Sequence, residues 1–476
     1  MAGLLDRFMG SSSDFNTAPT VYGDPAAIGP ASADFKSKVD VLVIGGGLCG
    51  LATARDLAKA GRTVLVAEKD RVGAGPSGRS GGQMWPGFEG SLGEMIEDLG
   101  SKKATAAWQI VHDGVRHIHK EILAQHPTHC DFQPGVLLVS KNKGDAQWIE
   151  EEAEVFKKAG FNWATYVDKA GLKDHLNSGV YRNALLYGGE KGEQYGHVNP
   201  LLYVQQLAKL AKEAGALIAE ESPVTAIRAR DGGGYVVTTT QGEVQAGQVV
   251  LATGSGFVRP EGLGLDVVPR FHMPVQTVIL ATEPMTRELA AKVVPGFACF
   301  ADAADSAMTY GRMVPANDGT DKVIFLFGGA DAVSQIHAEL EARKLEKELY
   351  TTYPALREQG VKVSTRWGGD CDLTRSALPV LAEVANDMFF VGGFSGQGMV
   401  NTVVYGRAVA EQITTGASEA FHALSALSPK PYANNELTAQ KQLAEKGLGL
   451  MWGDAKNFFG IGSKGKGAKP PQCVNG

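Results

Sequence analysis

The stretch VDVLVIGGGLCGLATARDLAKAGRTVLVAEK, residues 39–69, decides the fold. An apolar run typical of a buried strand leads into Gly45, Gly47 and Gly50, and a helical pattern follows them. Glycines at GxGxxG spacing let backbone N–H groups and the positive end of the helix approach a pyrophosphate. A second strand pattern completes the stretch, an order far more specific than an ordinary glycine-rich turn. The stretch therefore predicts a Rossmann-type dinucleotide site.

An acidic residue, Glu68, ends the second predicted strand. A carboxylate about twenty residues after the glycines accepts hydrogen bonds from both ribose hydroxyls and repels a 2′-phosphate. This favours FAD or NAD over NADP. We also expect Leu48, Cys49 and Lys69 to border the cofactor. Because no other cysteine is near Cys49 in the sequence, we interpret it as a small buried hydrophobe rather than a redox group.

The composition is that of a globular enzyme with more than one core. The 476 residues are 44% hydrophobic and 21% charged, and the net charge of -6 argues against nucleic acid as a partner. The cysteines are scattered singly, without zinc or disulfide spacing, which indicates a reducing compartment. No apolar run approaches the roughly 18 residues of a membrane span, and no signal peptide pattern begins the chain. We expect a soluble, unprocessed, cytoplasmic protein.

Strand-like runs alternate with amphipathic helical stretches along the chain, which is typical of an α/β fold with a parallel sheet covered by helices. Further strands are expected at residues 235–240, 245–252, 324–327 and 389–391, and further helices at 203–213 and 340–350. Nucleotide-site features occur in the first, middle and last thirds. We therefore expect one nucleotide domain assembled from separated segments.

A second glycine-rich segment separates FAD from NAD. RVGAGPSGRSGGQMW, residues 71–85, could wrap the rest of an extended cofactor, which NAD enzymes do not need. VVLATGSG, residues 249–256, and FFVGGFSGQGMVNTVVYGRAVAEQI, residues 389–413, are two more candidates. The second of these places glycines before a helix whose positive end could face the flavin ring. These segments favour FAD.

Together the motifs resemble a known family. GGGLCG, Glu68, SGRSGGQ, ATGSG and GFSGQGM are similar to those of the D-amino-acid oxidase-like FAD-dependent oxidoreductases, and especially of the gamma-glutamylputrescine oxidase-like branch. The resemblance covers roughly residues 39–420. It implies a Rossmann-type FAD-binding domain that carries a β-rich substrate domain over the flavin ring.

The resemblance also implies domain limits and cofactor contacts. The expected domains are a mobile leader at 1–38, an FAD-binding domain at 39–100, 190–265 and 365–420, a substrate domain at 101–189 and 266–364, and an extension at 421–476. The remaining expected cofactor contacts are Ser77, Gly78, Arg79, Ser80, Gly82, Gln83, Val224, Gly254, Gly393, Ser395, Gly396, Gln397, Gly398 and Met399. Arg79 could instead bind only the protein's own backbone.

Candidates for the substrate side are Trp85, Tyr310, Arg312, Trp367 and Gln397. Aromatic walls hold an amine by their π-faces, and an arginine can pair with a substrate carboxylate. Both tryptophans could equally be core residues, and the arginine could belong to a structural ion pair. Amine oxidation over a flavin depends on alignment and exclusion of water, so no dedicated base is required.

Two departures from the family bear on the cofactor and substrate. Relatives near this branch commonly carry histidine where this chain has Gln397, and glutamine does not titrate near neutral pH. Some relatives attach FAD through a cysteine in the last third. Because Cys371 does not align with that position, we predict a noncovalent flavin.

Two other segments could suggest further sites. VHDGVRHIHKEILAQHPTHC, residues 111–130, contains five histidines, but we interpret the first three as faces of one solvated helix and predict no metal. KGLGLMWGDAKNFFGIGSKGKGAK, in the polar, loosely held tail that begins near Pro429, mixes aromatic residues with lysines. This tail could rest on a membrane surface, be disordered or pack on its own domain.

The sequence thus predicts an FAD-dependent oxidoreductase that takes a hydride from the carbon next to an amine nitrogen. The substrate would be a polyamine derivative or a secondary amino acid, with dioxygen or an electron carrier as acceptor. A dehydrogenase of hydroxy acids on the same fold is one alternative. A binding or assembly protein that keeps FAD as a structural element is another.

Overall fold

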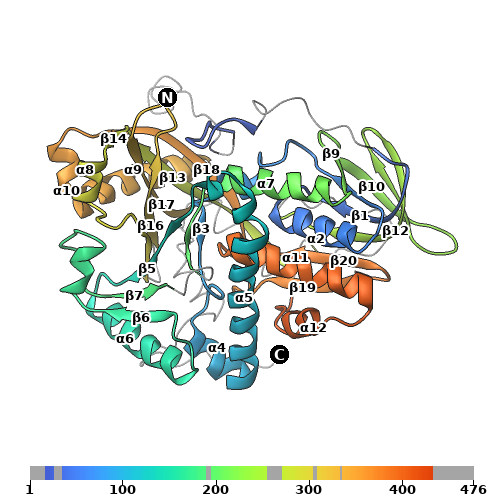
Figure 1. Cartoon of the computed structure of the whole chain (residues 1–476), viewed down its shortest axis with the longest axis horizontal. Coiled ribbons are helices and arrows are strands. Elements are labelled where there is room, and N and C mark those ends of the chain that lie inside the picture. Colours follow the sequence, from blue (N-terminus) through green and yellow to red (C-terminus); the bar gives the residue numbers. More distant parts are fainter. Residues whose placement is uncertain are drawn as a thin grey trace, which may run out of the picture.

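The computed structural model describes Phe15, residues 17–25, 35–188, 194–254, Val268, residues 271–303, 308–332 and 335–431. Two lobes lie side by side, each built on its own large sheet, with the long helix α5 (Ser101–Glu121) between them (Figure 1). Within the described part of the chain, no helix is both long and apolar enough to cross a membrane.

The first lobe is the expected nucleotide-binding sheet. Its path runs β10-β11-β12-β1-β2-β9, and β20 pairs with β12 and with β19. The strands are β1 (Lys38–Ile44), β2 (Val64–Ala67), β9 (Leu217–Ala219), β10 (Val224–Ala229), β11 (Tyr235–Thr239), β12 (Gly242–Leu251), β19 (Val380–Ala385) and β20 (Met388–Gly392). Parallel pairing joins β12, β1, β2 and β9, while β10 and β11 add an antiparallel hairpin at one edge.

Helices bury this sheet on the face seen in Figure 1. They are α2 (Leu48–Lys59), α7 (Pro200–Glu213) and α11 (Gly398–Thr415). The short α3 (Pro76–Arg79), within the glycine-rich segment, packs on α7 and β18 (Val363–Thr374). Val41, Leu42 and Val43 at the sheet centre have no exposed surface. Strands buried on both faces explain why residues 39–44 show a continuous apolar run rather than alternation. The fold class and these elements are confirmed.

The second lobe is β-rich, as expected. Its nine-stranded sheet has the order β18-β13-β17-β16-β15-β5-β7-β6, with β14 paired to β17. The strands are β5 (Val136–Val139), β6 (Ala164–Val167), β7 (Ala184–Tyr187), β13 (His272–Thr282), β14 (Met285–Thr286), β15 (Cys299–Asp302), β16 (Thr309–Pro315), β17 (Lys322–Ala332) and β18 (Val363–Thr374). Its helices are α6 (Lys143–Lys158), α8 (Arg287–Ala291), α9 (Gln335–Thr352) and α10 (Pro354–Glu358).

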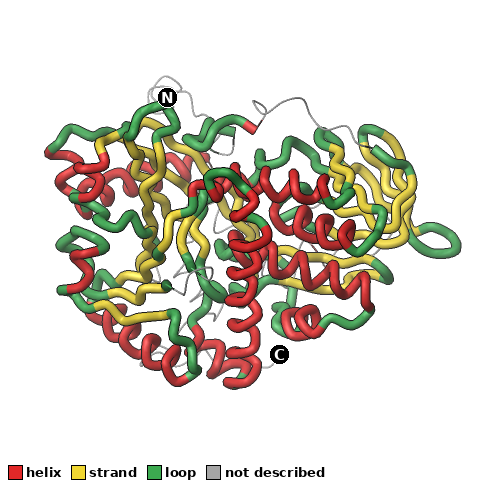
Figure 2. The backbone as a smooth tube through the Cα atoms, viewed as in Figure 1, coloured by secondary structure: helices red, strands yellow, loops and turns green. Residues whose placement is uncertain are grey.

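Short elements lie between the lobes or flank them. A small sheet joins β3 (Gln83–Met84), β8 (Gly196–His197) and β4 (Gln133–Pro134). Helix α4 (Leu92–Leu99) precedes α5, and α12 (Glu419–Ser425) packs against α11 and β19. Figure 2 shows the red helices on the outside of the second lobe and the yellow strands of its sheet facing the first lobe.

The division into domains remains a proposal, and two of its limits would move. Strand β18 pairs along its length with β13, so residues 365–374 belong to the second sheet. Helix α5 packs on α11, and its Trp108 and Val111 share a core with Val41 of β1. We would therefore assign residues 101–121 to the nucleotide lobe.

The expected mobile leader is wrong for the part that the structure describes. Phe15 and Tyr22 are buried, and Ala18 and Tyr22 belong to the core that surrounds β1. No periodic pattern marks this segment in the sequence, because it packs as irregular chain held by single side chains and backbone hydrogen bonds. The polar tail from residue 432 onward lies outside the described residues.

Candidate functional site

The turn between β1 and α2 requires glycine at two positions. Gly45 has a φ of 110°, and a Cβ there would collide with the carbonyl oxygen of Ala252. A Cβ at Gly50 would overlap with the carbonyl oxygen of Gly45. The first turn of α2 is thereby drawn close to the ends of β1 and β12. Main chain rather than side chain forms the surface at this point.

The N-terminus of α2 suits a phosphate group. Its N-cap residue is Gly47, no side chain caps it, and no acidic residue occurs in its first turn. A Cβ at Gly47 would lie 2.9 Å from Oγ of Ser77, which itself accepts a hydrogen bond from the Leu48 N–H at 3.1 Å. The helix dipole and the N–H groups of this turn can thus stabilise the cofactor's pyrophosphate. The loop fits FAD.

Glu68 folds over the same loop. Its Oε2 accepts a hydrogen bond from Gly46 N–H at 2.6 Å, and its Oε1 accepts one from Asp70 N–H at 2.9 Å. Burial raises the pKa of this carboxyl, against the effect of the two backbone hydrogen bonds. Each carboxylate oxygen has a second lone pair, which leaves room for ribose hydroxyls. Lys69 points away and pairs with Asp70 at 3.5 Å.

The glycine-rich segment, residues 71–85, meets the other two cofactor segments. Ser77 contacts the first loop through Leu48, and the Ser80 hydroxyl lies 3.2 Å from the sulfur of Met399 at the start of α11. Gly82, with a φ of 70°, packs directly under the carbonyl of Val198. These contacts join three segments that are far apart in sequence, and their convergence on one flavin stays a prediction.

The turn before α11 is held by a small hydrogen-bond network. Ser395 has a φ of 50°, donates its N–H to Asp372 O at 3.0 Å and accepts a hydrogen bond from Thr374 N–H on its hydroxyl at 3.1 Å. Gly393 packs against the Thr374 side chain, where a Cβ would collide. The N-terminus of α11 has no side-chain cap, so it is available to polar atoms of a cofactor.

Gln397, the N-cap residue of α11, points its amide at a residue that the sequence did not single out. Its Nε2 donates to Oε2 of Glu89 at 2.8 Å, while its Oε1 is buried with no partner among the described residues. Glu89 follows the glycine-rich segment without a motif of its own. Only its spatial closeness to α11 reveals it.

Two predicted residues serve the protein itself. Arg79 donates to the backbone oxygens of Gly368, Phe15 and Ala18 at 2.8–3.2 Å. Trp367 is fully buried and donates its Nε1–H to Arg79 O at 2.8 Å. The interpretation of Trp367 as a core residue fits these contacts. A direct role of Arg79 on the flavin stays a prediction.

The other side chains of the glycine-rich segment face the second lobe. Gln83 donates to Phe300 O at 3.2 Å and accepts a hydrogen bond from Trp85 Nε1–H at 2.9 Å. Trp85 also packs edge-on against Tyr187, with ring centroids 6.0 Å apart. The ring of Tyr310 lies over Gly81 and Gly328, where a side chain on either glycine would displace it.

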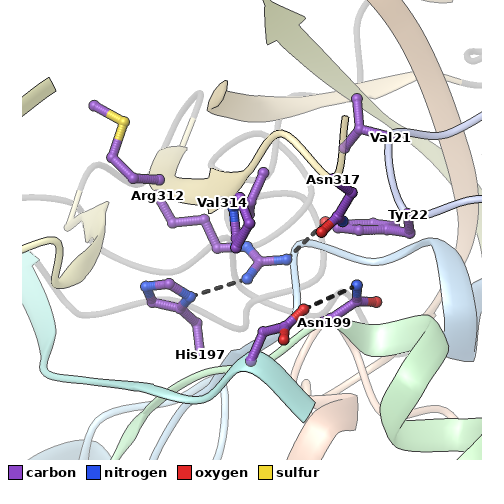
Figure 3. A pocket seen from close by; sticks show the side chains of 10 residues that line it. Val21, Tyr22, His197, Asn199, Arg312, Val314 and Asn317 are labelled. Atoms are coloured by element: carbon purple, nitrogen blue, oxygen red, sulfur yellow. Dashed lines mark hydrogen bonds between the residues drawn. The ribbon is translucent and has the colours of Figure 1, made fainter. Parts of the chain in front are cut away.

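Arg312 is the strongest charged feature on the substrate side. Only 2% of its surface is exposed. Its guanidinium lies between two neutral groups, donating to His197 Nδ1 at 2.9 Å and to the Tyr22 hydroxyl at 2.8 Å (Figure 3). Within the described residues its Nε has no partner and no carboxylate pairs with it. A buried cation without a counter-ion favours an anionic ligand.

The contacts of His197 fix its protonation state. Arginine only donates, so Nδ1 of His197 must be the acceptor, and its Nε2–H donates to Phe297 O at 2.9 Å. Burial, together with the charge of Arg312, lowers the pKa of His197 to about 3. The imidazole therefore stays neutral and does not repel Arg312. Neither His197 nor Tyr22 stands out in the sequence by a motif or a spacing.

The space beside Arg312 is narrow. A cavity of about 10 Å³ lies there, lined among others by Val21, Tyr22, His197 and Asn199. This is about the volume that the centre of one water molecule can explore. The N-terminal residues Val21 and Tyr22 form one wall of it (Figure 3).

The remaining predicted cofactor positions lie in several different elements. Cys49 is buried in α2, and burial raises the pKa of its thiol to about 12, in keeping with a hydrophobic role. Val224 is buried in β10, and Gly254, with a φ of 54°, follows β12 next to Asp372. The other positions are Gly78 in α3, Gly396 before α11, and Gly398 and Met399 in its first turn.

The interpretation of the histidines as a solvated helix face needs correction. His112 on α5 is 5% exposed, stacks on Trp163 with centroids 4.9 Å apart and bonds the Tyr195 hydroxyl at 2.6 Å. Helix α5 is covered from several sides by α4, α11 and α12, so its histidines are drawn inward. No described group of residues could hold a metal ion.

The phosphate loop, the glycine-rich segment and the turn before α11 define a two-lobed flavoprotein. The chain belongs to the FAD dependent oxidoreductase family, whose model matches residues 40–412. FAD is therefore its cofactor, and the chain is an oxidoreductase. The match begins after the N-terminal residues that contact Arg312.

Curated relatives support the family. The chain is 32% identical to a probable oxidoreductase, OrdL, of Haemophilus influenzae, over 79% of this chain and 82% of that protein. It is 30% identical to the gamma-glutamylputrescine oxidoreductase of Escherichia coli, over 83% of this chain and 87% of that protein. Other relatives include mitochondrial dimethylglycine dehydrogenases and a glycine oxidase. The names of three of these relatives refer to an amine or an amino acid, namely gamma-glutamylputrescine, dimethylglycine and glycine.

Solved structures share the fold. L-proline dehydrogenase from P. horikoshii superposes with a TM-score of 0.64 at 20% identity, covering 81% of this chain and 96% of that one. Glycine oxidase from Bacillus cereus gives a TM-score of 0.60 at 20% identity, covering 83% and 100%. At this identity the likeness concerns the fold alone.

Proposed function

We propose that this FAD-dependent oxidoreductase oxidises a C–N bond in a small amine or amino acid that carries a carboxylate. A polyamine derivative or a secondary amino acid fits best. The relatives named for gamma-glutamylputrescine, dimethylglycine and glycine support this class, since each of these molecules carries both an amine and a carboxylate. Dioxygen or an electron carrier would be the final acceptor.

The observation that carries the proposal is the uncompensated charge of Arg312. A guanidinium that is 2% exposed, and whose two hydrogen-bond partners are both neutral, is costly to bury unless an anion completes the site. Its neighbour Gly82 belongs to the glycine-rich segment, and a Cβ there would lie 2.8 Å from Nη2 of Arg312. A substrate carboxylate on Arg312 would therefore lie beside the predicted flavin site.

The residues around Arg312 would align the substrate and exclude water from the site. When bound beside these residues, FAD would supply the acceptor for a hydride from the carbon next to the substrate nitrogen. Trp85 and Tyr310 offer aromatic faces at the border of the two lobes, where they can hold an amine and exclude water. Gln397, paired with Glu89, provides a polar but non-titrating group at the start of α11. We propose these three residues and Arg312 as the substrate-side set.

The cofactor contacts remain part of the proposal. The loop glycines with Leu48, Glu68 and Ser77 would hold the pyrophosphate and ribose, and the segments around Ser80 and Gly398 would hold the ring. We also propose a reducing location such as the cytoplasm. Burial raises the pKa of the Cys130 and Cys299 thiols to about 12, and neither forms a disulfide.

Anaerobic reduction of the purified flavoprotein tests this function. The panel would pair a gamma-glutamylated diamine with its parent diamine, N-methyl amino acids with N-methylamines, and each amino acid with the matching 2-hydroxy acid. We expect bleaching of the flavin by carboxylate-bearing amines, and much slower bleaching by their partners. Bleaching by 2-hydroxy acids but not by amines would replace this function by hydroxy-acid oxidation. Bleaching by dithionite alone would contradict both.

A further inference from the structure

The N-terminal strap, which we define as Phe15 with residues 17–25, is fastened to both lobes. The carbonyl of Phe15 accepts hydrogen bonds from Gly368 N–H of β18 and from Arg79, both at 2.9 Å. Ala18 O accepts a second bond from Arg79 at 2.8 Å. Arg79 therefore connects the strap to the glycine-rich segment, and Gly368 connects it to the edge of the second sheet.

Tyr22 is the residue through which the strap reaches the substrate side. Its hydroxyl donates to Ser80 O at 2.9 Å and accepts a hydrogen bond from Arg312 Nη2 at 2.8 Å. One hydroxyl can serve both contacts, since it has one hydrogen and two lone pairs. Its ring lies edge-on to Trp367 with centroids 5.7 Å apart, and the Arg312 guanidinium lies 5.5 Å from its centroid. Tyr22 as a whole is 8% exposed.

Both terminal nitrogens of the Arg312 guanidinium are thus held by hydrogen bonds, each to a different neighbouring residue. His197 takes a hydrogen of Nη1 and Tyr22 takes one of Nη2, while Nε is left without a partner among the described residues. An arginine side chain has several rotatable bonds, and ordering it on ligand binding would cost affinity. Because two neutral acceptors already hold the Arg312 side chain, little of this ordering cost remains when a ligand binds. The acceptors do not neutralise the positive charge of the guanidinium.

We propose that the strap closes the substrate site and that Tyr22 is a positioning residue, which holds Arg312 in the orientation that receives a substrate carboxylate. The proposal rests on the proposed function, in which Arg312 binds that carboxylate. It adds a residue outside the matched family region to the specificity machinery. The rival arrangement is a plug, in which the strap competes with the carboxylate for Arg312.

Binding of a simple carboxylate to the FAD-loaded full-length protein separates these cases. The probes are benzoate and its uncharged analogue benzamide, followed by flavin difference spectra and by equilibrium dialysis. The variants are Tyr22→Phe, Arg312→Gln and, as a matched control, Tyr166→Phe on the edge strand β6. Tyr22→Phe removes one hydroxyl and keeps the ring, so the core contact with Trp367 is preserved.

We expect Tyr22→Phe to weaken benzoate binding about tenfold, because the lost hydrogen bond involves a charged group. Benzamide binding should not change, and Tyr166→Phe should leave both affinities unchanged. With substrate, the same variant should raise KM for carboxylate-bearing amines and leave kcat nearly constant. A general loosening of the fold would instead affect both probes.

The outcomes distinguish the two levels of the proposal. If Arg312→Gln weakens benzoate binding and Tyr22→Phe does not, the positioning role is overturned and the proposed function stands. If Arg312→Gln has no effect, carboxylate recognition by Arg312 fails and the strap proposal fails with it. Tighter benzoate binding in Tyr22→Phe would identify a plug and overturn the positioning role.

Discussion

The loop between β1 and α2 and the cluster around Arg312 are built in opposite ways. In the loop, Gly45 and Gly50 are needed because their missing side chains let main-chain atoms approach one another. In the cluster, three side chains from the strap, β8 and β16 hold one another by hydrogen bonds. A site made of backbone leaves a contiguous motif in the sequence. A site made of side chains from distant segments leaves none.

The largest expected effect comes from a substitution in the β1–α2 loop, the site that is built of main chain. Gly50→Val would place side-chain atoms on the carbonyl of Gly45, and overpacking of this kind costs about 2 kcal/mol or more in addition to displacing α2. We expect protein that purifies without flavin and binds added FAD at least about 100-fold more weakly. Flavin absorbance per protein and FAD titration measure it.

Gly179→Ala is the matched control, since nothing lies within 4 Å of a Cβ there. It should retain full flavin content. Normal FAD binding by Gly50→Val would show that the loop is not the cofactor site.

The next effect addresses the side-chain cluster. Arg312→Ala removes the only buried guanidinium that the described residues place beside Tyr22 and His197. We expect KM for a carboxylate-bearing amine to rise about 100-fold, since truncating one partner of a buried charged contact costs about 2–5 kcal/mol. For the matched plain amine, KM should change little. Steady-state kinetics on both substrates checks this, and equal changes would make Arg312 a structural residue.

The β1–α2 loop could be predicted from the sequence because the residues that form it are neighbours in the chain. Strand, turn and helix follow one another within residues 39–69, and the periodicity of each is set by the sheet and helix that it builds. The contacts of Ser77 with Leu48 and of Ser80 with Met399 join three of the predicted segments, whose convergence on one flavin stays a prediction. Even so, the hydrogen bonds of Arg79 to the strap, and the full burial of Trp367, depend on long-range packing.

The cluster could not be read, although Arg312 was a candidate. Tyr22 lies in an irregular segment with no motif, and His197 lies in YGHVNP without metal-like or catalytic spacing. What gives them meaning is a hydrogen-bond chain whose members are 115 and 290 residues apart. Sequence spacing carries no information on such contacts. The inward-facing His112 was misread for the same reason, because its covering helices come from elsewhere.

A smaller effect is the pH dependence of the free energy of unfolding that a buried carboxyl, Glu152, should cause. Glu152 on α6 is 4% exposed and accepts hydrogen bonds from the Leu92 and Gly93 N–H groups, and burial raises its pKa to about 7. Between the unfolded value near 4.5 and 7 the folded protein binds more protons, so stability falls as pH rises through this window. The loss is on the order of 3 kcal/mol.

Glu152→Gln should abolish this part of the slope. Urea unfolding of both proteins at several pH values between 4.5 and 8 measures it. Parallel pH dependences of wild type and variant would exclude Glu152 as the source.

The smallest expected effect is none. We predict a noncovalent flavin, held by the loop and the glycine-rich segment, so Cys371→Ser should leave flavin content unchanged. Acid precipitation of wild type and variant should release all of the yellow colour into the supernatant. A coloured pellet from the wild type that turns colourless in the variant would show a covalent bond to Cys371.

The strap has a consequence for how the chain matures during synthesis. Tyr22 leaves the ribosome early, yet its partner Arg312 follows 290 residues later, and the Trp367 ring against which it rests comes later still. Until both residues have been synthesised, the Tyr22 ring lacks its packing partners. Contacts of such long sequence separation also form slowly. The nucleotide sheet is completed equally late, because β20 and α11 follow Trp367 in the chain, so the strap can dock only once most of the polypeptide has been made.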